Sequence, residues 1–131
     1  MNYKELKSVE VNMLEEKQRI PLTYYLKGPK IGTAPIVLIN HPLTANAFFT
    51  GKYGWWNEIV GKNKVIDTLK YTIISFNIPG NGIDVYEWKN LNEIHAGHIA
   101  ILFLKGLKKL KINKLHAIIG GSIGGGISWE M

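Results

Sequence analysis

The chain has 131 residues, a formal net charge of +6 and no cysteine. This length allows at most one ordinary domain, and 46% hydrophobic with 20% charged residues is typical of a globular chain, not a disordered one. The absence of cysteine excludes disulfides, thiolate catalysis and a cysteine-based zinc site. The sequence has neither a signal-peptide pattern nor a bilayer-spanning apolar run, so we expect a cytoplasmic protein outside the membrane.

The first predicted elements are strands. Residues 9–13 and 20–26 alternate apolar and polar side chains around a charged turn, which predicts an antiparallel hairpin. Residues 36–40 form a short continuous apolar run, as expected for a central strand covered on both faces. The polar turn at His41 follows this strand, at the edge where open α/β sheets place ligands.

A helix, a strand and a second helix are predicted next. Residues 55–65 favour a helix and residues 71–78 a buried strand. The second helix is predicted to begin near Asn90, with Glu93 at the capping-box spacing, and to reach Lys111. Its predicted apolar stripe consists of Ile94, Ile101, Leu104 and Leu107. This alternation of strands and helices predicts a parallel sheet with right-handed crossovers.

Positive charge gathers near the end of that second helix. Lysines late in a helix interact favourably with its negative dipole end, and no aromatic-rich basic loop or nucleic-acid motif accompanies them. We therefore expect no nucleic-acid partner. The lysines concerned are Lys105, Lys108, Lys109, Lys111 and Lys114.

The last strand, residues 114–119, leads into a glycine-rich turn around Ser122. The pattern G-x-S-x-G fits a nucleophile elbow, in which Gly120 and Gly124 leave room for a strained serine and neighbouring glycines extend the clearance. The amide of Ile123, in the first turn of a following helix, can stabilise an oxyanion. A phosphate-binding loop and a dinucleotide fingerprint do not fit the spacing. A structural turn, with Ser122 only as a helix N-cap, remains an alternative.

Several segments together resemble the homoserine O-acetyltransferase family of α/β-hydrolase-fold acyltransferases. Their order and spacing match the family as well as their residues, over most of the chain from about Ile36 onward. The resembling segments are 41–44 (HPLT, where the family usually has HALT), 54–56 (GWW), 66–68 (IDT), 77–80 (NIPG) and 120–125 (GGSIGG), followed by Trp129.

The resemblance implies an acyl-enzyme route: serine takes an acetyl group from acetyl-CoA and passes it to the hydroxyl of homoserine in methionine biosynthesis. It assigns the nucleophile to Ser122 and the oxyanion hole to the backbone amides of Leu43 and Ile123. Acetyl-CoA is then a substrate, and no permanently bound cofactor or metal is expected. The short stretch after Gly80 departs from the family pattern and leaves the acceptor open. An α/β-hydrolase-fold esterase, with water as acceptor, is the nearest alternative.

The implied fold is a truncated α/β-hydrolase fold: an antiparallel hairpin leading into a parallel sheet with flanking helices, ending just after the elbow. Residues 1–131 would form the N-terminal part of one domain. The later strands, the lid, and the catalytic aspartate and histidine of the family would then lie beyond Met131. The isolated chain is expected to be inactive. Its last strand would be an exposed edge that invites a second copy or a complementing chain, so a non-catalytic partner-binding fragment is the alternative of another class.

Other polar residues in the sequence are assigned structural roles with a functional alternative. His41 is expected to shape its loop rather than transfer protons, and His116 to pack at a sheet edge. His95 and His98 have the i, i+3 spacing of half a metal site, but no third ligand is evident. The adjacent tryptophans Trp55 and Trp56 are expected to be partly core, although they could contact substrate. The two aspartates, Asp67 and Asp84, both precede the elbow.

Overall fold

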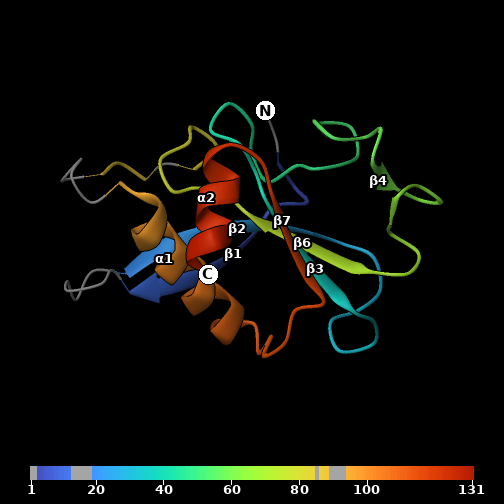
Figure 1. The fold of residues 1–131 in the computed structure, drawn as a ribbon. Helices are drawn as coiled ribbons and strands as arrows, with labels where there is room; N and C mark the ends of the chain where they lie inside the picture. Colours follow the sequence, from blue (N-terminus) through green and yellow to red (C-terminus); the bar gives the residue numbers. More distant parts are fainter. Residues whose placement is uncertain (1–2, 13–18, 85, 89–93) are drawn as a thin grey trace.

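The computed structural model describes residues 3–12, 19–84, 86–88 and 94–131. In this part of the chain a five-stranded sheet has the order β1-β2-β6-β3-β7, and β4 and β5 form a separate two-stranded sheet (Figure 1). The strands are β1 Lys7–Asn12, β2 Arg19–Lys27, β3 Ile36–Asn40, β4 Val60–Gly61, β5 Ile66–Asp67, β6 Thr72–Phe76 and β7 Ala117–Gly120. The helices are α1 Ala96–Lys109 and α2 Ile123–Glu130. Neither helix is long and apolar enough to cross a bilayer.

The predicted hairpin and parallel strands are confirmed. β1 pairs with β2 in an antiparallel ladder, and β2 then pairs antiparallel with β6. β6, β3 and β7 run parallel, with β3 between the other two. All five residues of β3 and all five of β6 are buried, as expected for central strands covered on both faces.

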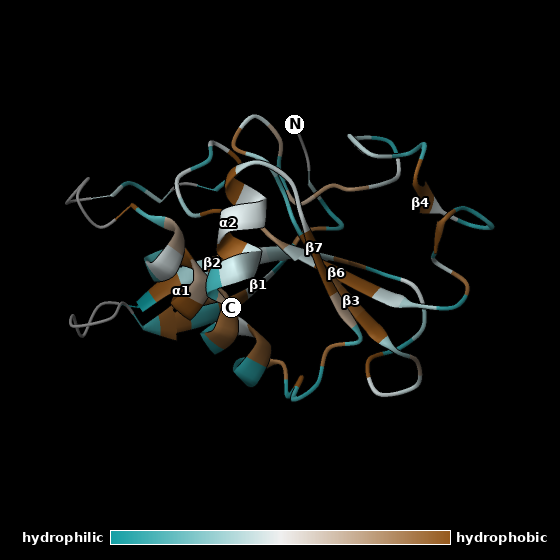
Figure 2. Ribbon diagram, in the orientation of Figure 1, coloured by the Kyte–Doolittle hydropathy of each residue, from teal (hydrophilic) through white to brown (hydrophobic). Residues whose placement is uncertain are grey.

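Two apolar cores lie on opposite faces of the main sheet. Successive residues of a strand point to opposite faces, so Leu38 and Ile74 pack beneath the helices, together with Phe103 of α1 and Ile127 of α2. On the other face Val37 and its neighbours pack against the long loops that follow β3. The parallel strands β3, β6 and β7 accordingly show much of the brown, hydrophobic colour in Figure 2. Both helices lie side by side on one face, as Figure 1 shows.

The predicted helix over residues 55–65 is wrong. This region consists of turns that lead into β4 and β5. The amides of Trp55 and Trp56 bond back to the carbonyls of Phe48 and Phe49, which ties the segment to the preceding loop. Asn63 adopts a left-handed φ of 61°, which a helix does not accommodate.

The helix before β7 is confirmed, but its start and its apolar face differ from the prediction. α1 begins at Ala96, with His95 at the N-cap accepting from the amide of His98 at 3.1 Å. Asn90 and Glu93, the expected capping pair, lie outside the described residues. Ile101 and Leu104 are 40% and 43% exposed rather than core. Leu107 of the predicted stripe is buried, and the other apolar residues of the buried face are Ile99, Ala100, Leu102 and Phe103.

Candidate active site

Ser122 lies on a sharp turn between the end of β7 and the start of α2. Its φ of 56° and ψ of −128° belong to a backbone region that residues with side chains rarely adopt. The residue is exposed, and its side chain makes no capping hydrogen bond to α2. Ser122 thus occupies the N-cap position of α2 without capping it through its side chain, and the turn has the strained geometry that a nucleophile elbow requires.

Two glycines make this turn possible. A Cβ on Gly120 would overlap the carbonyl group of Gly124 and approach Ser128 Oγ to 2.5 Å. A Cβ on Gly124 would overlap the carbonyl of Asn40, at the end of β3. The other glycines are not sterically required in the same way: a Cβ on Gly121 would meet nothing within 4 Å. A Cβ on Gly125 would lie 3.3 Å from the carbonyl oxygen of Gly120, a tight contact without overlap, so the steric requirement is strongest at Gly120 and Gly124.

A buried polar link fixes α2 against β3. Asn40 is 1% exposed and donates from Nδ2 to Ser128 Oγ at 2.9 Å. Ser128 in turn donates to the carbonyl of Gly124 at 2.8 Å. Together with the close contact at Gly124, this link sets the position of the helix that follows Ser122. The sequence analysis missed both residues, because strand-end asparagines carry no periodic signal.

The loop containing Leu43 and the Ser122 turn leave the same edge of the sheet. β3 and β7 are adjacent and parallel, and Asn40 is paired with Gly120 at their carboxyl ends. The expected convergence of the two loops is thus supported at the level of the backbone. Ile123 is the first residue of α2, where amides lack intrahelical acceptors. The side chain of Leu43 is 65% exposed, so only its amide is a candidate for oxyanion stabilisation.

His41 is a buried structural residue of that loop. Its Nδ1 lies 2.7 Å from the carbonyl of Pro42, and its Nε2 accepts from the amide of Ile78 at 3.1 Å. These partners select the neutral tautomer protonated on Nδ1. Burial lowers the pKa of His41, and the Pro42 hydrogen bond offsets only part of that effect. The predicted loop-shaping role is supported, since both ring nitrogens already have backbone partners.

Asn77 joins the loop after β3 to the loop after β6. It is fully buried, and its Oδ1 accepts from the amide of Ala47 at 2.8 Å and from Asn81 Nδ2 at 3.0 Å. Its Nδ2 donates to Thr23 Oγ1 at 3.0 Å. Asn77 belongs to the NIPG segment, but its role as a hub between the two loops was not predicted.

The remaining histidines do not approach Ser122 in hydrogen-bond contact. His116 is exposed beside β7 and stacks on Tyr71 with ring centroids 5.5 Å apart, consistent with the expected edge position. His95 caps α1. Among residues 3–12, 19–84, 86–88 and 94–131, no cluster of three or more histidine or acidic side chains is arranged for a metal ion.

The two aspartates organise loops. Asp67 accepts from the amides of Asn63 and Leu69, and these hydrogen bonds lower its pKa. Asp84 accepts from the amides of Gly80 and Tyr86, but burial has the larger effect and raises its pKa.

The two tryptophans of the GWW segment form part of the second core. Trp55 and Trp56 stack with centroids 5.3 Å apart and planes 7° apart, and both are half-buried. The indole nitrogen of Trp55 donates to the carbonyl of Asn46 at 2.8 Å. This supports the expected structural role.

Comparisons with known proteins identify relatives of this chain in sequence and in structure. No family model matches the chain. The homoserine O-acetyltransferase of Zymomonas mobilis is 36% identical over 107 residues, which cover 68% of this chain and 29% of that protein. The homoserine O-acetyltransferase of Methanobrevibacter ruminantium is 33% identical over 129 residues, covering 82% of this chain and 26% of that protein. The chain thus spans about three tenths of the length of the curated relatives it matches.

Solved structures agree with this result. The crystal structure of homoserine O-acetyltransferase from Bacillus anthracis matches with a TM-score of 0.78 at 23% identity, over 95% of this chain and 42% of that chain. Esterase E22 matches with a TM-score of 0.77 at 21% identity, over 94% of this chain and 42% of that chain. Together with the sheet order and the strained serine turn, these likenesses define the chain as an α/β-hydrolase-fold protein. Within that class its sequence is related to the homoserine O-acetyltransferases, which confirms the resemblance predicted from the motifs.

Proposed function

We propose that Ser122 is the nucleophile of an acyl transfer carried out by a homoserine O-acetyltransferase-like protein. The observation that carries this proposal is an exposed serine held at φ 56° between a parallel strand and a helix. Its Oγ attacks the carbonyl carbon of an acetyl-CoA thioester, and the amides of Leu43 and Ile123 stabilise the resulting oxyanion. The thiol of CoA leaves with a proton, and the acetyl group stays on Ser122.

In the second half of the reaction a homoserine-like hydroxyl attacks the acetyl-enzyme and releases Ser122. Acetyl-CoA is a substrate in this scheme, with no permanently bound cofactor, and we place the reaction in the cytoplasm as part of methionine biosynthesis. Support for homoserine as acceptor and for acetyl as the transferred group comes from the named relatives, whose alignments cover about two thirds of the chain.

The proposal also requires a proton acceptor beside Ser122. No hydrogen bond joins Ser122 Oγ to another side chain in the described ranges, and both ring nitrogens of His41 contact the backbone. In serine triads, loss of the histidine costs about 10⁶-fold in turnover and leaves ~10³–10⁴-fold catalysis over water. We therefore assign the base to residues of the complete domain beyond the segment described here, and expect the 131-residue chain alone to turn over poorly.

The test is to trap the acetyl-enzyme. The chain is fused to the residues that follow the aligned segment in the Zymomonas mobilis relative, incubated with acetyl-CoA, and analysed by peptide mass spectrometry. We expect an acetyl group on the peptide containing Ser122 and none in Ser122→Ala, whose circular dichroism should match the parent. Acetylation elsewhere while Ser122 stays unmodified would refute the assignment.

An esterase is the second candidate within the same chemistry, because esterase E22 matches the fold as well as a homoserine O-acetyltransferase does. The two functions differ in what attacks the acetyl-enzyme. Adding homoserine should accelerate loss of the acetyl group and yield O-acetylhomoserine if the protein is a transferase. A rate of acetate release that is independent of homoserine would identify the esterase.

A different class of function follows from the edge of the sheet. β7 is the last strand in the described order, and its residue Ile118 is 36% exposed. A groove of about 260 Å³ lies beside it, lined by apolar side chains including Leu104 and Leu115, and by the polar side chains of Lys108, Asn113 and Lys114. Trp129 on α2 is 90% exposed. An unpaired apolar edge of this kind recruits a further strand, so we propose that the chain also binds a complementing chain or a second copy here.

The edge proposal is tested by sedimentation velocity across a range of concentrations. We expect the chain to self-associate, and Ile118→Lys to weaken association because lysine blunts an edge strand. Val65→Lys is the matched control: Val65 is 80% exposed but lies in the turn between β4 and β5, so association should persist. A monomer at all concentrations, or equal effects of the two variants, would contradict the proposal.

A further inference from the structure

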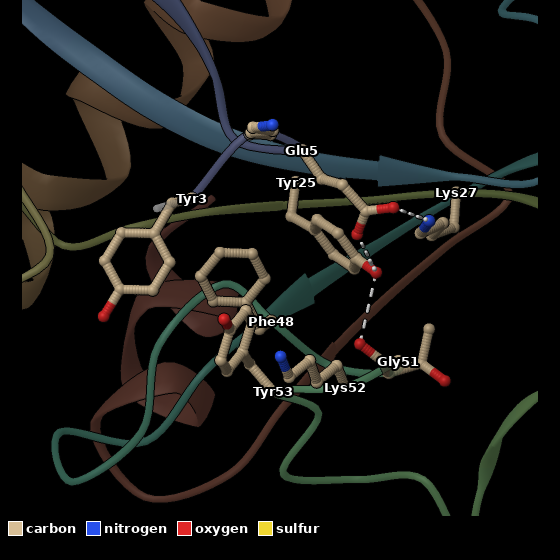
Figure 3. A pocket seen from close by; sticks show the side chains of 10 residues that line it. Tyr3, Glu5, Tyr25, Lys27, Phe48, Gly51, Lys52 and Tyr53 are labelled. Carbon is tan, nitrogen blue, oxygen red and sulfur yellow. Dashed lines mark hydrogen bonds and ion pairs between the residues drawn. The ribbon is translucent and has the colours of Figure 1, made fainter. Parts of the chain in front are cut away.

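A pocket of about 350 Å³ opens on the sheet face opposite the two helices (Figure 3). Its walls come from three separate parts of the chain: the N-terminal segment at Tyr3, β2 at Tyr25, and the loop from Phe48 to Tyr53. None of Ser122, Ile123 and Leu43 lines it. The pocket is therefore separate from the candidate active site.

Aromatic rings form one wall of this pocket. The rings of Tyr3, Phe48 and Tyr53 contact one another in pairs, with centroids 5.3, 5.7 and 5.6 Å apart. Tyr25 packs edge-on against Phe48 at 5.0 Å, behind the wall. Tyr3 and Phe48 lie at 33° to each other, and Tyr53 is partly exposed. Such a surface offers ring faces and edges to a planar apolar group.

Positive charge surrounds the same wall. The pocket is lined by Lys4, Lys27 and Lys52 but by a single acidic residue, Glu5, which leaves two positive charges in excess. Glu5 pairs with Lys27 at 2.9 Å. Lys52 forms no ion pair within the described residues, and its Nζ lies 5.5 Å from the centroid of the Tyr53 ring. In Figure 3 its side chain reaches back toward Tyr53 and Phe48, so its charge lies beside the aromatic wall.

The floor of the pocket is held in place before any ligand arrives. Tyr25 is 1% exposed and its hydroxyl donates to the carbonyl of Thr50 at 3.2 Å, as the dashed line in Figure 3 marks. The Glu5–Lys27 pair crosses from the N-terminal segment to β2 and fixes that side. Binding therefore does not have to order these groups, which reduces its entropic cost.

We propose that this pocket binds a planar aromatic anion of about the size of a nucleoside monophosphate. The ring of the ligand packs against Tyr3 and Tyr53, and its phosphate or carboxylate is neutralised by Lys52 and Lys4. The volume lies at the lower end of the ~300–1,000 Å³ range of small-molecule sites, which suits one ring system with one anionic group. A lysine binds phosphate as a point charge, so the site requires no bidentate geometry.

The experiment is isothermal titration calorimetry of the 131-residue chain with AMP, adenosine and inorganic phosphate as separate probes. We expect saturable binding of AMP at one site, with both other probes at least about tenfold weaker, because each satisfies only half of the pocket. Lys52→Glu should weaken AMP binding by about tenfold or more, as expected for loss of one charge-assisted contact. Tyr53→Ala should weaken AMP and adenosine alike.

The control variant is Lys62→Glu, which makes the same charge change at an exposed residue between β4 and β5. It should leave AMP binding unchanged if the pocket is the site. Equal weakening by both variants would show attraction to the net charge alone, and phosphate binding as tight as AMP would remove the role of the aromatic wall. Absence of saturable AMP binding would also overturn the proposal, independently of whether Ser122 is a nucleophile.

Discussion

Gly124 is the residue on which the position of the serine turn depends most directly. Alanine normally favours a helix over glycine by about 1 kcal/mol. At Gly124 the added Cβ would instead overlap the carbonyl of Asn40, so we expect Gly124→Ala to lower the free energy of unfolding by about 1–3 kcal/mol. Gly126→Ala, in the same helix, adds a Cβ that only meets Ala96 Cβ at 3.8 Å and should be neutral or stabilising. Urea unfolding of both variants distinguishes the two outcomes; equal midpoints would contradict the steric argument.

His41 should make stability depend on pH. Its pKa is lowered in the folded state, so as the pH falls below about 6.5 the unfolded chain takes up a proton before the folded chain does. Stability is therefore fully present above that pH and declines below it, by up to about 1.4 kcal/mol per pH unit.

The measurement compares urea unfolding between pH 7.5 and 5 for the parent and for His41→Asn. The variant should be less stable but show a flatter pH dependence, because the other titrating groups, including Asp84, are common to both proteins. Parallel curves for the parent and His41→Asn would disprove the role given to His41.

At the scale of elements, Asn77 connects the two loops that border the candidate site. Asn77→Ala leaves the amide of Ala47 and the hydroxyl of Thr23 without their partner. We expect a loss of about 1–3 kcal/mol, the usual cost of a buried unsatisfied group. Hydrogen exchange should show faster exchange at the Ala47 amide. Asn113→Ala, at an exposed position before β7, should change neither quantity, and an Ala47 amide that stays protected would argue against the hub.

The elements differ in how well the sequence predicts them, and the reason is physical. β3 is predicted with its observed bounds, because a continuous apolar run between polar turns fits a strand buried on both faces. The failed helix at residues 55–65 has Trp55 and Ile59 at helical spacing, yet these side chains pack into a core made by loops. Gly54 and Asn63 are the local signals against a helix.

The residues of the candidate site also differ in how well the sequence predicts them. Ser122 is predictable because its glycines are adjacent in the sequence and have a steric meaning. Asn40 and Asn77 are not, because their partners Ser128 and Thr23 lie 88 and 54 residues away. Hydrogen bonds over such separations depend on the strand order, which periodicity alone does not provide.

At the scale of the whole molecule, different structural features lie on the two faces of the sheet. The face covered by α1 and α2 holds the helix core, the opposite face holds the loop core and the aromatic pocket, and the serine turn lies at the carboxyl end of β7. The loop that follows β3 contributes to both the candidate site and the pocket, since Leu43 lies near its start and Phe48 lines the pocket. A ligand in the pocket and an acyl group on Ser122 would thus contact different parts of one connection.

The strand order also has a kinetic consequence. β7 is paired with β3, which lies about eighty residues earlier in the chain, through contacts such as Val37 with Ala117. Closing so long a loop is entropically costly and slows folding relative to local pairing. During synthesis on the ribosome, the turn at Ser122 therefore cannot settle until β7 has emerged and paired with β3, and the hairpin of β1 and β2 can form long before it.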